Sequence, residues 1–355
     1  MHEQGKHFGV DEVGASVAAE AARLTVGKTA KRVLSTLAIL LAIGLGAPVT
    51  SAGACAPTIT PGESINRVTA SCPGGTTFTI KDGSYKLSGP VNVDSRDTYR
   101  GSYFDGSRPT IDANGAKAAF VVGNTNGVQI SGLDVTGAKG GDYCEPGCGS
   151  AIMGDGTNLR VSNVRLHHNL NQGIGNPGDG FLLENSEIDH NGSYSFTILD
   201  RNSGKEPSSS AGIKTVHGAA TFRNNKIHDN YWIGIWCDQR GGPFVATGNN
   251  IYNNGKVGIQ YETCTGSSKI KNNTITHNGY INASTPTPKA GILGQDPQGL
   301  EVAYNTIADH PQHGIQVVNG PRQSIFGVKI HDNRLRNDTV QGCSLSGVLC
   351  FANGL

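Results

Sequence analysis

The stretch that decides the fold is NNKIHDN at residues 224–230, followed by GIWCD at residues 234–238. The chain then repeats it as NNIYNN at 249–254, followed by GIQYE at 258–262. Both copies contain Asn-x-Ile-x-x-Asn and then Gly-Ile, and the central residues Ile227 and Ile251 are 24 residues apart. A fixed period of this size is typical of proteins built from stacked structural repeats.

The same phrase can be followed through six copies. The central aliphatic residues are Leu166, Ile188, Ile227, Ile251, Ile275 and Ile307, and three positions later come Asn169, Asn191, Asn230, Asn254, Asn278 and His310. The Gly-Ile pairs begin at Gly173, Gly212, Gly234, Gly258, Gly291 and Gly314. Stacked asparagines can hydrogen-bond from layer to layer, so we expect an asparagine column at one turn. Loops inserted at Leu199–Ser210 and Tyr280–Lys289 lengthen the period.

Composition agrees with turn-rich β-structure. The 355 residues include 50 glycines, and only 6% are aromatic and 16% charged. A glycine inside a helix costs about 1 kcal/mol, which argues against an ordinary helical protein. The formal net charge of +1 provides no electrostatic case for nucleic-acid binding, which needs a clustered basic face.

The phrase, its period and the short strands it implies resemble the right-handed parallel β-helix proteins of the pectate-lyase-like superfamily, over about residues 75–340. The resemblance implies an all-β solenoid with inserted loops. We expect a leader and signal peptide at residues 1–54, a disulfide-stapled cap segment at 55–80, the β-helix at 81–340 and a disulfide-bearing tail at 341–355. The superfamily includes lyases, hydrolases, epimerases and non-enzymatic proteins, so the resemblance alone does not determine the chemistry.

Export is predicted from the N-terminal region and the cysteines. Basic residues precede an apolar run at 33–49, which is too short to span a bilayer comfortably, and the small residues 52–54 follow it. The eight cysteines fall into sequence neighbours, which suggests the local disulfides Cys55–Cys72, Cys144–Cys148, Cys237–Cys264 and Cys343–Cys350 in an oxidising compartment. Lipid anchoring at Cys55 is a minor alternative to secretion. We expect a monomer without a membrane span.

The candidate site follows from the register of the repeat. Because side chains alternate along a strand, inward Ile235 and Ile259 place the even-numbered residues on the outer face. These are Trp236, Asp238, Gln260 and Glu262, with Lys214 in the copy before and Gln295 and Gln316 in the copies after. Strands about 4.8 Å apart would bring the two carboxylates together, as in a retaining glycosidase. We expect an open face on which Trp236 offers a plane for stacking a sugar.

The same residues leave two other enzymatic readings open. In a lyase or epimerase of uronate polysaccharides, Lys214 would be the base that removes a proton, with Arg201 or Arg240 countering the uronate carboxylate. His217, three residues after Lys214, is a further candidate for substrate binding. The catalytic motifs of the pectate lyases and polygalacturonases in the superfamily are not recognisable here, so these roles rest on register.

A non-catalytic interpretation is also possible. Lys214, Asp238 and Glu262 would then form a solvated cluster of ion pairs on a β-helix that binds glycans or serves as an exported surface protein. No spacing of cysteines and histidines indicates a bound transition metal. The resemblance leaves calcium possible, although the acidic residues do not form a dense set of ligands.

Overall fold

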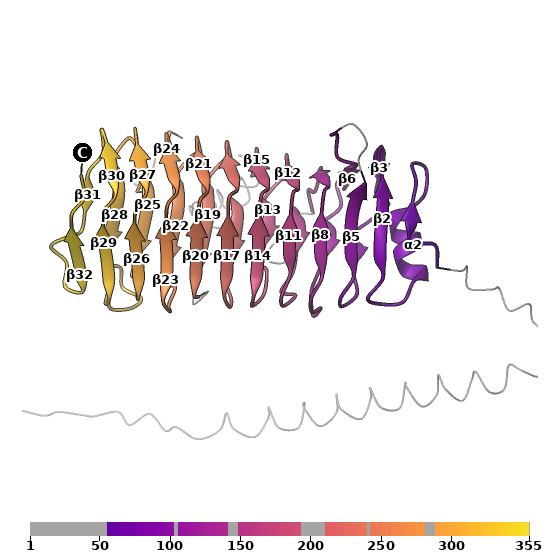
Figure 1. Cartoon of the computed structure of the whole chain (residues 1–355), viewed down its shortest axis with the longest axis horizontal. Coiled ribbons are helices and arrows are strands. Elements are labelled where there is room, and N and C mark those ends of the chain that lie inside the picture. Colours follow the sequence, from indigo (N-terminus) through magenta and orange to yellow (C-terminus); the bar gives the residue numbers. More distant parts are fainter. Residues whose placement is uncertain are drawn as a thin grey trace, which may run out of the picture. The chain divides into compact units, whose positions relative to one another are not determined.

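The structure is a computed structural model that describes residues 55–102, 106–140, 148–192, 210–239, 242–280 and 288–354. These residues form three parallel sheets, here called A, B and C, of 12, 10 and 10 strands. Successive turns of the chain each add a strand to A, then to B, then to C, and the strands stack side by side along the molecule (Figure 1). The predicted right-handed parallel β-helix is therefore confirmed.

The strands are short, as the sequence predicts. Sheet A contains β1 (Thr58–Ile59), β2 (Thr77–Lys81), β5 (Thr98–Ser102), β8 (Gln129–Ser131), β11 (Arg160–Ser162), β14 (Phe181–Glu184), β17 (Ala220–Arg223), β20 (Phe244–Thr247), β23 (Ser268–Lys271), β26 (Leu300–Ala303), β29 (Val328–His331) and β32 (Val348–Phe351). Sheet B contains β3 (Ser84–Lys86), β6 (Thr110–Asp112), β9 (Asp134–Thr136), β12 (Arg165–His167), β15 (Glu187–Asp189), β18 (Lys226–His228), β21 (Asn250–Tyr252), β24 (Thr274–Thr276), β27 (Thr306–Ala308) and β30 (Arg334–Arg336).

Sheet C contains the longest strands, which lie toward its C-terminal end. It contains β4 (Val91–Asn92), β7 (Ala118–Val121), β10 (Ser150–Met153), β13 (Gln172–Gly175), β16 (Ala211–Thr215), β19 (Ile233–Asp238), β22 (Val257–Glu262), β25 (Ala290–Gln295), β28 (His313–Val318) and β31 (Val340–Gln341). β19, β22, β25 and β28 each have six residues, enough to present two outward side chains beyond the Gly-Ile pair.

The predicted aliphatic columns form the core. In sheet B, Ile227 pairs in register with Ile251, and in sheet C, Ile235 pairs with Ile259. Both columns belong to one continuous apolar cluster that runs from Ile59 to Ile330. A repeat cannot bury these side chains alone, so the stack gains its stability from contacts between neighbouring turns.

The predicted asparagine column is a hydrogen-bonded ladder. Asn254 receives bonds from the backbone and side chain of Asn230 at 3.2 and 2.9 Å, and its own amide donates to Asn278 at 2.9 Å. A second ladder, which we did not predict, lies at the turn between sheets A and B. Its members are Asn225, Asn249, Asn273, Asn305, Asn333 and Asn353.

The ladder also explains the glycine of the Gly-Ile pair. A Cβ atom on Gly234 would lie 2.5 Å from the carbonyl oxygen of Gly258 and 2.9 Å from the side-chain nitrogen of Asn254. Any larger residue at this position would push the next turn and the ladder apart.

A short helix, α2 (Ile65–Ser71), lies in the cap segment, and its N-terminus is capped by Ser64. The disulfides Cys55–Cys72, Cys237–Cys264 and Cys343–Cys350 confirm three of the predicted pairs. Cys148 is also disulfide-bonded, but its predicted partner Cys144 lies outside the described residues, as does the predicted signal peptide. In the described part of the chain, no helix has both the length and the apolar character that crossing a membrane requires.

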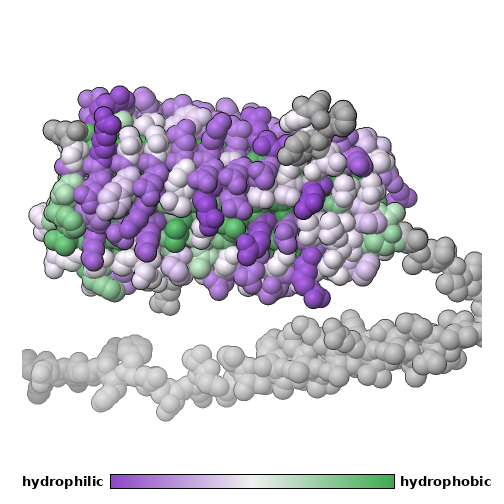
Figure 2. Space-filling model, in the orientation of Figure 1, coloured by the Kyte–Doolittle hydropathy of each residue, from purple (hydrophilic) through white to green (hydrophobic). Residues whose placement is uncertain are grey.

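Polar side chains cover most of the face shown in Figure 2, and apolar ones show at both ends of the β-helix and in a narrow band between them. Leu349 and Phe351 of β32 are among the exposed large apolar residues.

Candidate active site

Two rows of outward side chains lie on neighbouring strands in the middle of sheet C. One row is Lys214, Trp236 and Gln260, and the other is Asp238, Glu262 and Gln295, each level with the next in the strand register. Between the rows, Cys237 and Tyr261 point into the core, as the alternation predicts. The structure therefore brings Lys214, Asp238 and Glu262 onto one face.

This face is buried, contrary to the expectation of an open surface. Asp238 is 4% exposed and Glu262 is 6% exposed. Trp236 packs in a small apolar cluster outside the main core, with Trp232 and Leu293 among its members. The interpretation as a solvated cluster of ion pairs is therefore wrong, because the carboxylates have lost most of their contact with water.

Trp236 is not an open stacking surface as it lies here. Its ring is 7% exposed, and the Lys214 ammonium nitrogen lies 3.6 Å from the ring centroid. The indole N–H donates to Glu262 Oε2 at 3.1 Å. The ring thus holds a cation over its face and a carboxylate at its edge, a favourable arrangement for an indole.

Glu262 accepts four hydrogen bonds. Besides the bond from Trp236, Gln260 donates to Oε2 at 2.7 Å, and Gln295 and Arg322 donate to Oε1 at 3.2 and 2.8 Å. Both oxygens of this buried carboxylate are therefore satisfied, as a buried charge requires.

Asp238 is bound on one side only. Its Oδ2 lies 2.9 Å from Lys214 Nζ. Its Oδ1 is buried, and no hydrogen bond reaches it from the described residues. Arg322 Nη1 lies 3.8 Å from Oδ1, too far for a hydrogen bond, so one guanidinium nitrogen lies within 3.8 Å of both carboxylates.

Arg322 was not predicted as a site residue. It lies in the loop between β28 and β29, and its side chain is half exposed. Asp296, fully buried at the end of β25, accepts bonds from the backbone N–H groups of Gly320 and Arg322. Gln323 donates its side-chain N–H to the Asp296 carbonyl at 2.6 Å. Asp296 therefore anchors the loop that brings Arg322 to the carboxylates.

A disulfide ties together the two turns that carry the carboxylates. Cys237 directly precedes Asp238, and Cys264 lies two residues after Glu262. Because the bond lies on the core side of these strands, it limits their movement relative to each other without occupying the outer face.

The structure says less about the other predicted site residues, which are His217, Gln316, Arg201 and Arg240. His217 is exposed in the turn after β16, and no contact between it and the carboxylates is seen among the described residues. Gln316 lies on β28 in the same row as Gln260, two strands further on, and donates to Gln341 at 2.5 Å. Arg201 and Arg240 lie outside the described residues, so their roles remain predictions.

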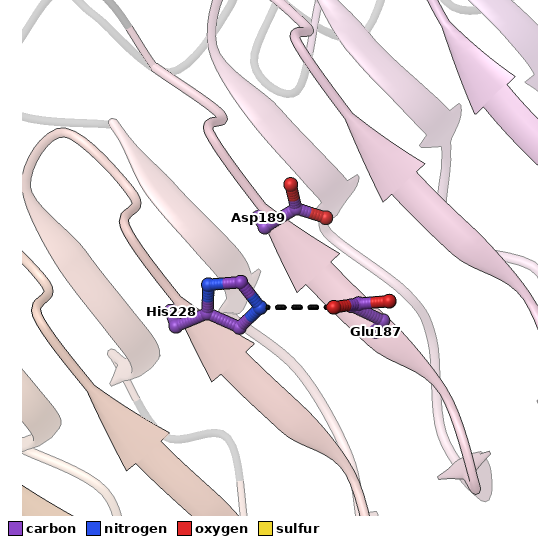
Figure 3. A group of neighbouring side chains, drawn as sticks. All are labelled: Glu187, Asp189 and His228. Carbon is purple, nitrogen blue, oxygen red and sulfur yellow. Dashed lines mark hydrogen bonds and ion pairs between the residues drawn. The ribbon is translucent and has the colours of Figure 1, made fainter.

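A second polar group lies on sheet B. Figure 3 shows Glu187 and Asp189 on β15 beside His228 on β18, with ligand atoms within 4.8 Å of one another. Arg165 binds both oxygens of Asp189 at 2.9 and 2.8 Å, and His228 bonds Glu187 at 3.1 Å and Asp229 at 2.7 Å. Arg165 already supplies a positive charge to this group. The two carboxylates and the imidazole therefore have partners without a metal ion.

Ionisable neighbours of this group have shifted pKa values. Burial acts to raise the pKa of Asp189, but hydrogen bonds from Arg165 and His190 outweigh it and hold the pKa below the usual value. Burial and the neighbouring His167 and His190 lower the pKa of His168. This side of sheet B thus favours an ionised aspartate and a neutral His168.

The family model for the right-handed β-helix region matches residues 99–266 and 209–353. The chain belongs to this family. Among solved structures, an alginate lyase from Paenibacillus sp. FPU-7 is 12% identical, with 82% of this chain and 98% of that chain covered and a TM-score of 0.57. A DFA-IIIase from Arthrobacter chlorophenolicus A6 is 14% identical, with 84% and 90% covered and a TM-score of 0.50. A pectate lyase is 16% identical, with 85% and 80% covered and a TM-score of 0.41. No curated protein matches the chain by sequence.

Proposed function

We propose that this protein is a secreted carbohydrate-active enzyme that cleaves glycosidic bonds in a polysaccharide, with Asp238 as its reactive carboxylate. The observation that carries the proposal is Asp238 Oδ1, a buried carboxylate oxygen without a hydrogen bond from the described residues. Leaving such an atom unpaired costs about 1–3 kcal/mol or more. Native proteins retain few such atoms, and a catalytic role is one reason to keep one.

The chemistry follows from what each oxygen contacts. Asp238 Oδ1 is available to attack an anomeric carbon or to take a proton from water, while Lys214 holds Oδ2 in place. Glu262 supplies the second carboxylate. Since both of its oxygens accept hydrogen bonds, it can act as an acid only after Arg322 has turned away into solvent and Oε1 has taken up a proton from water, which it then donates to the leaving oxygen. The half-exposed Arg322 side chain already reaches solvent.

The lyase or epimerase alternative requires a neutral Lys214. Its side-chain nitrogen lies 2.9 Å from Asp238 and 3.6 Å from the Trp236 ring centroid, so it is enclosed between a carboxylate and an indole ring. A base must reach the proton that it removes, and Lys214 points at Asp238 instead, so the geometry supports hydrolysis over proton abstraction.

Export is supported by the disulfides. Cys55–Cys72, Cys237–Cys264 and Cys343–Cys350 are bonds of the kind that form and persist in oxidising compartments. We therefore keep secretion as part of the proposal.

The test is a screen of the purified protein against neutral and uronate polysaccharides. Reducing ends report any cleavage, and ultraviolet absorbance reports the unsaturated uronate that a lyase leaves. Asp238→Asn should lower turnover by on the order of 10³-fold. Asp189→Asn is the matched control, because Asp189 is equally buried and also paired with a long cation, but on sheet B. Equal turnover by the two variants would refute the role of Asp238.

A Lys214→Ala variant separates the two enzymatic readings. Ultraviolet-absorbing product from the wild-type protein, lost in this variant, would replace hydrolysis with elimination. Binding of a glycan without any turnover, unchanged in Asp238→Asn, would support a non-catalytic β-helix instead.

A further inference from the structure

The charges of the described site cancel. The two carboxylates, Asp238 and Glu262, face two cations, and each cation already has a carboxylate partner: Lys214 lies 2.9 Å from Asp238, and Arg322 lies 2.8 Å from Glu262. A uronate residue would bring a further negative charge to this buried face. No uncompensated positive charge among the described residues of the site is available to offset the cost of burying it.

Gln260, the polar side chain next to the carboxylates, has one atom left without a partner, and that atom is a hydrogen-bond acceptor. Gln260 is 3% exposed, and its amide nitrogen donates to Glu262 at 2.7 Å. Because a carboxylate can only accept, this bond fixes which end of the amide is the oxygen. The remaining atom, Gln260 Oε1, is buried and receives no hydrogen bond from the described residues. It can bind a hydroxyl group, but it would repel a carboxylate oxygen.

The row of Lys214, Trp236 and Gln260 continues on the next two strands and ends in another hydrogen-bond acceptor. Beyond Gln260 come Leu293 on β25 and Gln316 on β28. The amide of Gln316 bonds Gln341, and its Oε1 is likewise buried without a hydrogen bond. Leu293 is 1% exposed and packs in the apolar cluster with Trp236, so the row offers a sugar the acceptor oxygens of its two amides and no open apolar plane.

We propose that the site takes a neutral, hydroxyl-rich polysaccharide and discriminates against uronate polymers. This inference rests on the proposed function. Hydroxyl groups of the bound sugar donate to Gln260 Oε1 and to Asp238 Oδ1, the two buried acceptors nearest the reaction. A uronate in the same place would set its carboxylate against these two acceptors.

The experiment uses substrates that differ only in charge. Purified protein is given polygalacturonate and the same polymer after its carboxyl groups have been reduced to alcohols, together with alginate, a fructan and a galactan. We expect reducing ends from at least one neutral polymer, at a rate that changes less than twofold between 50 and 500 mM salt, roughly the insensitivity expected of an uncharged ligand. Turnover of every uronate polymer should be at least about tenfold lower, the ratio that 1.4 kcal/mol produces.

Two failures can be told apart. Turnover of a uronate polymer at equal or higher rate, lost in Asp238→Asn, would overturn the neutral-substrate inference and leave the proposed function standing; Arg201 and Arg240 would then be the cations to replace. Turnover of no polymer, or turnover that Asp238→Asn leaves intact, would overturn the proposed function and this inference with it.

A glutamine variant tests the acceptor row directly. Gln316→Leu removes an amide distant from the carboxylates, so we expect KM for the neutral polymer to rise about two- to tenfold while kcat is kept, as for one uncharged hydrogen bond. Gln129→Leu is the matched control, because Gln129 is an exposed glutamine on β8 of sheet A, on another face of the β-helix. Equal KM values for the two variants would remove Gln316 from the substrate site and contradict the row as a sugar-binding surface.

Discussion

Replacing Glu262 with glutamine should destabilise the fold by about 3 kcal/mol. Glu262 accepts hydrogen bonds from four donors, two at each oxygen. Glutamine offers one oxygen and one NH₂ group, so two of the four donors would meet another donor. A hydrogen bond to a charged group contributes about 1.5–3 kcal/mol, and we take the lower end for both because Arg322 is half exposed and can rehydrate.

The assay is thermal or denaturant unfolding of Glu262→Gln beside a matched control, Glu301→Gln. Glu301 is also ion-paired, to Lys271 at 2.7 Å and to His331 at 3.1 Å, but its side chain is 27% exposed. Exposed pairs contribute at most about 1 kcal/mol. At about 2 °C per kcal/mol for a domain of this size, the Tm of Glu262→Gln should fall by about 6 °C and that of Glu301→Gln by about 2 °C or less. An equal or smaller fall for Glu262→Gln would refute the four-donor account of this residue.

Three further predictions concern the asparagine ladder, His168 and the loop that carries Arg322. Asn254→Ala should cost about 3 kcal/mol in chemical unfolding, because it leaves the backbone N–H of Asn230 buried without a partner, and a loss below about 1 kcal/mol would contradict the ladder. The lowered pKa of His168 means that the folded state resists its protonation, so stability should fall as pH drops below about 6.5. His168→Asn, which suits the left-handed φ of 52°, should flatten Tm against pH between about 5 and 6.5, and an unchanged profile would contradict the assignment. Asp296→Asn should raise KM more than it lowers kcat, and Arg322→Ala should add little to it in a double-mutant cycle, whereas fully additive effects would show that Asp296 does not act through Arg322.

The period of the sequence predicted the register because the spacing of repeats determines which residues are stacked. Aligning Ile227 with Ile251 and Ile235 with Ile259 predicted both pairings. The same register placed Asp238 level with Glu262, and alternation turned both outward. The second asparagine ladder had an equally regular signal. Asn225 and Asn249 are the first residues of Asn-x-Ile-x-x-Asn, but only its last asparagine, three residues after the aligned aliphatic, was predicted to form a column.

Burial of the site could not be predicted in the same way. Alternation shows which side chains leave the core, but it does not show what packs over them. Trp232 is the residue just before β19, and its side chain packs with Trp236 and Leu293 in an apolar cluster outside the core. A small cluster of this kind depends on tertiary packing between turns, so the expectation of an exposed Trp236 failed although its direction was right.

Arg322 could not be predicted from the repeat. Its guanidinium reaches Glu262 from 60 residues further along the chain, and it lies in the loop between β28 and β29, outside the repeated phrase. The loop is placed by Asp296, which ends β25 in a left-handed conformation and there accepts two backbone N–H groups. Such a contact depends on a single residue, not on a period. Three strands and one loop therefore build the charge-balanced site: β19 and β22 supply carboxylates at a spacing that stacking dictates, β16 supplies Lys214, and the loop supplies the second cation, which a substrate can displace.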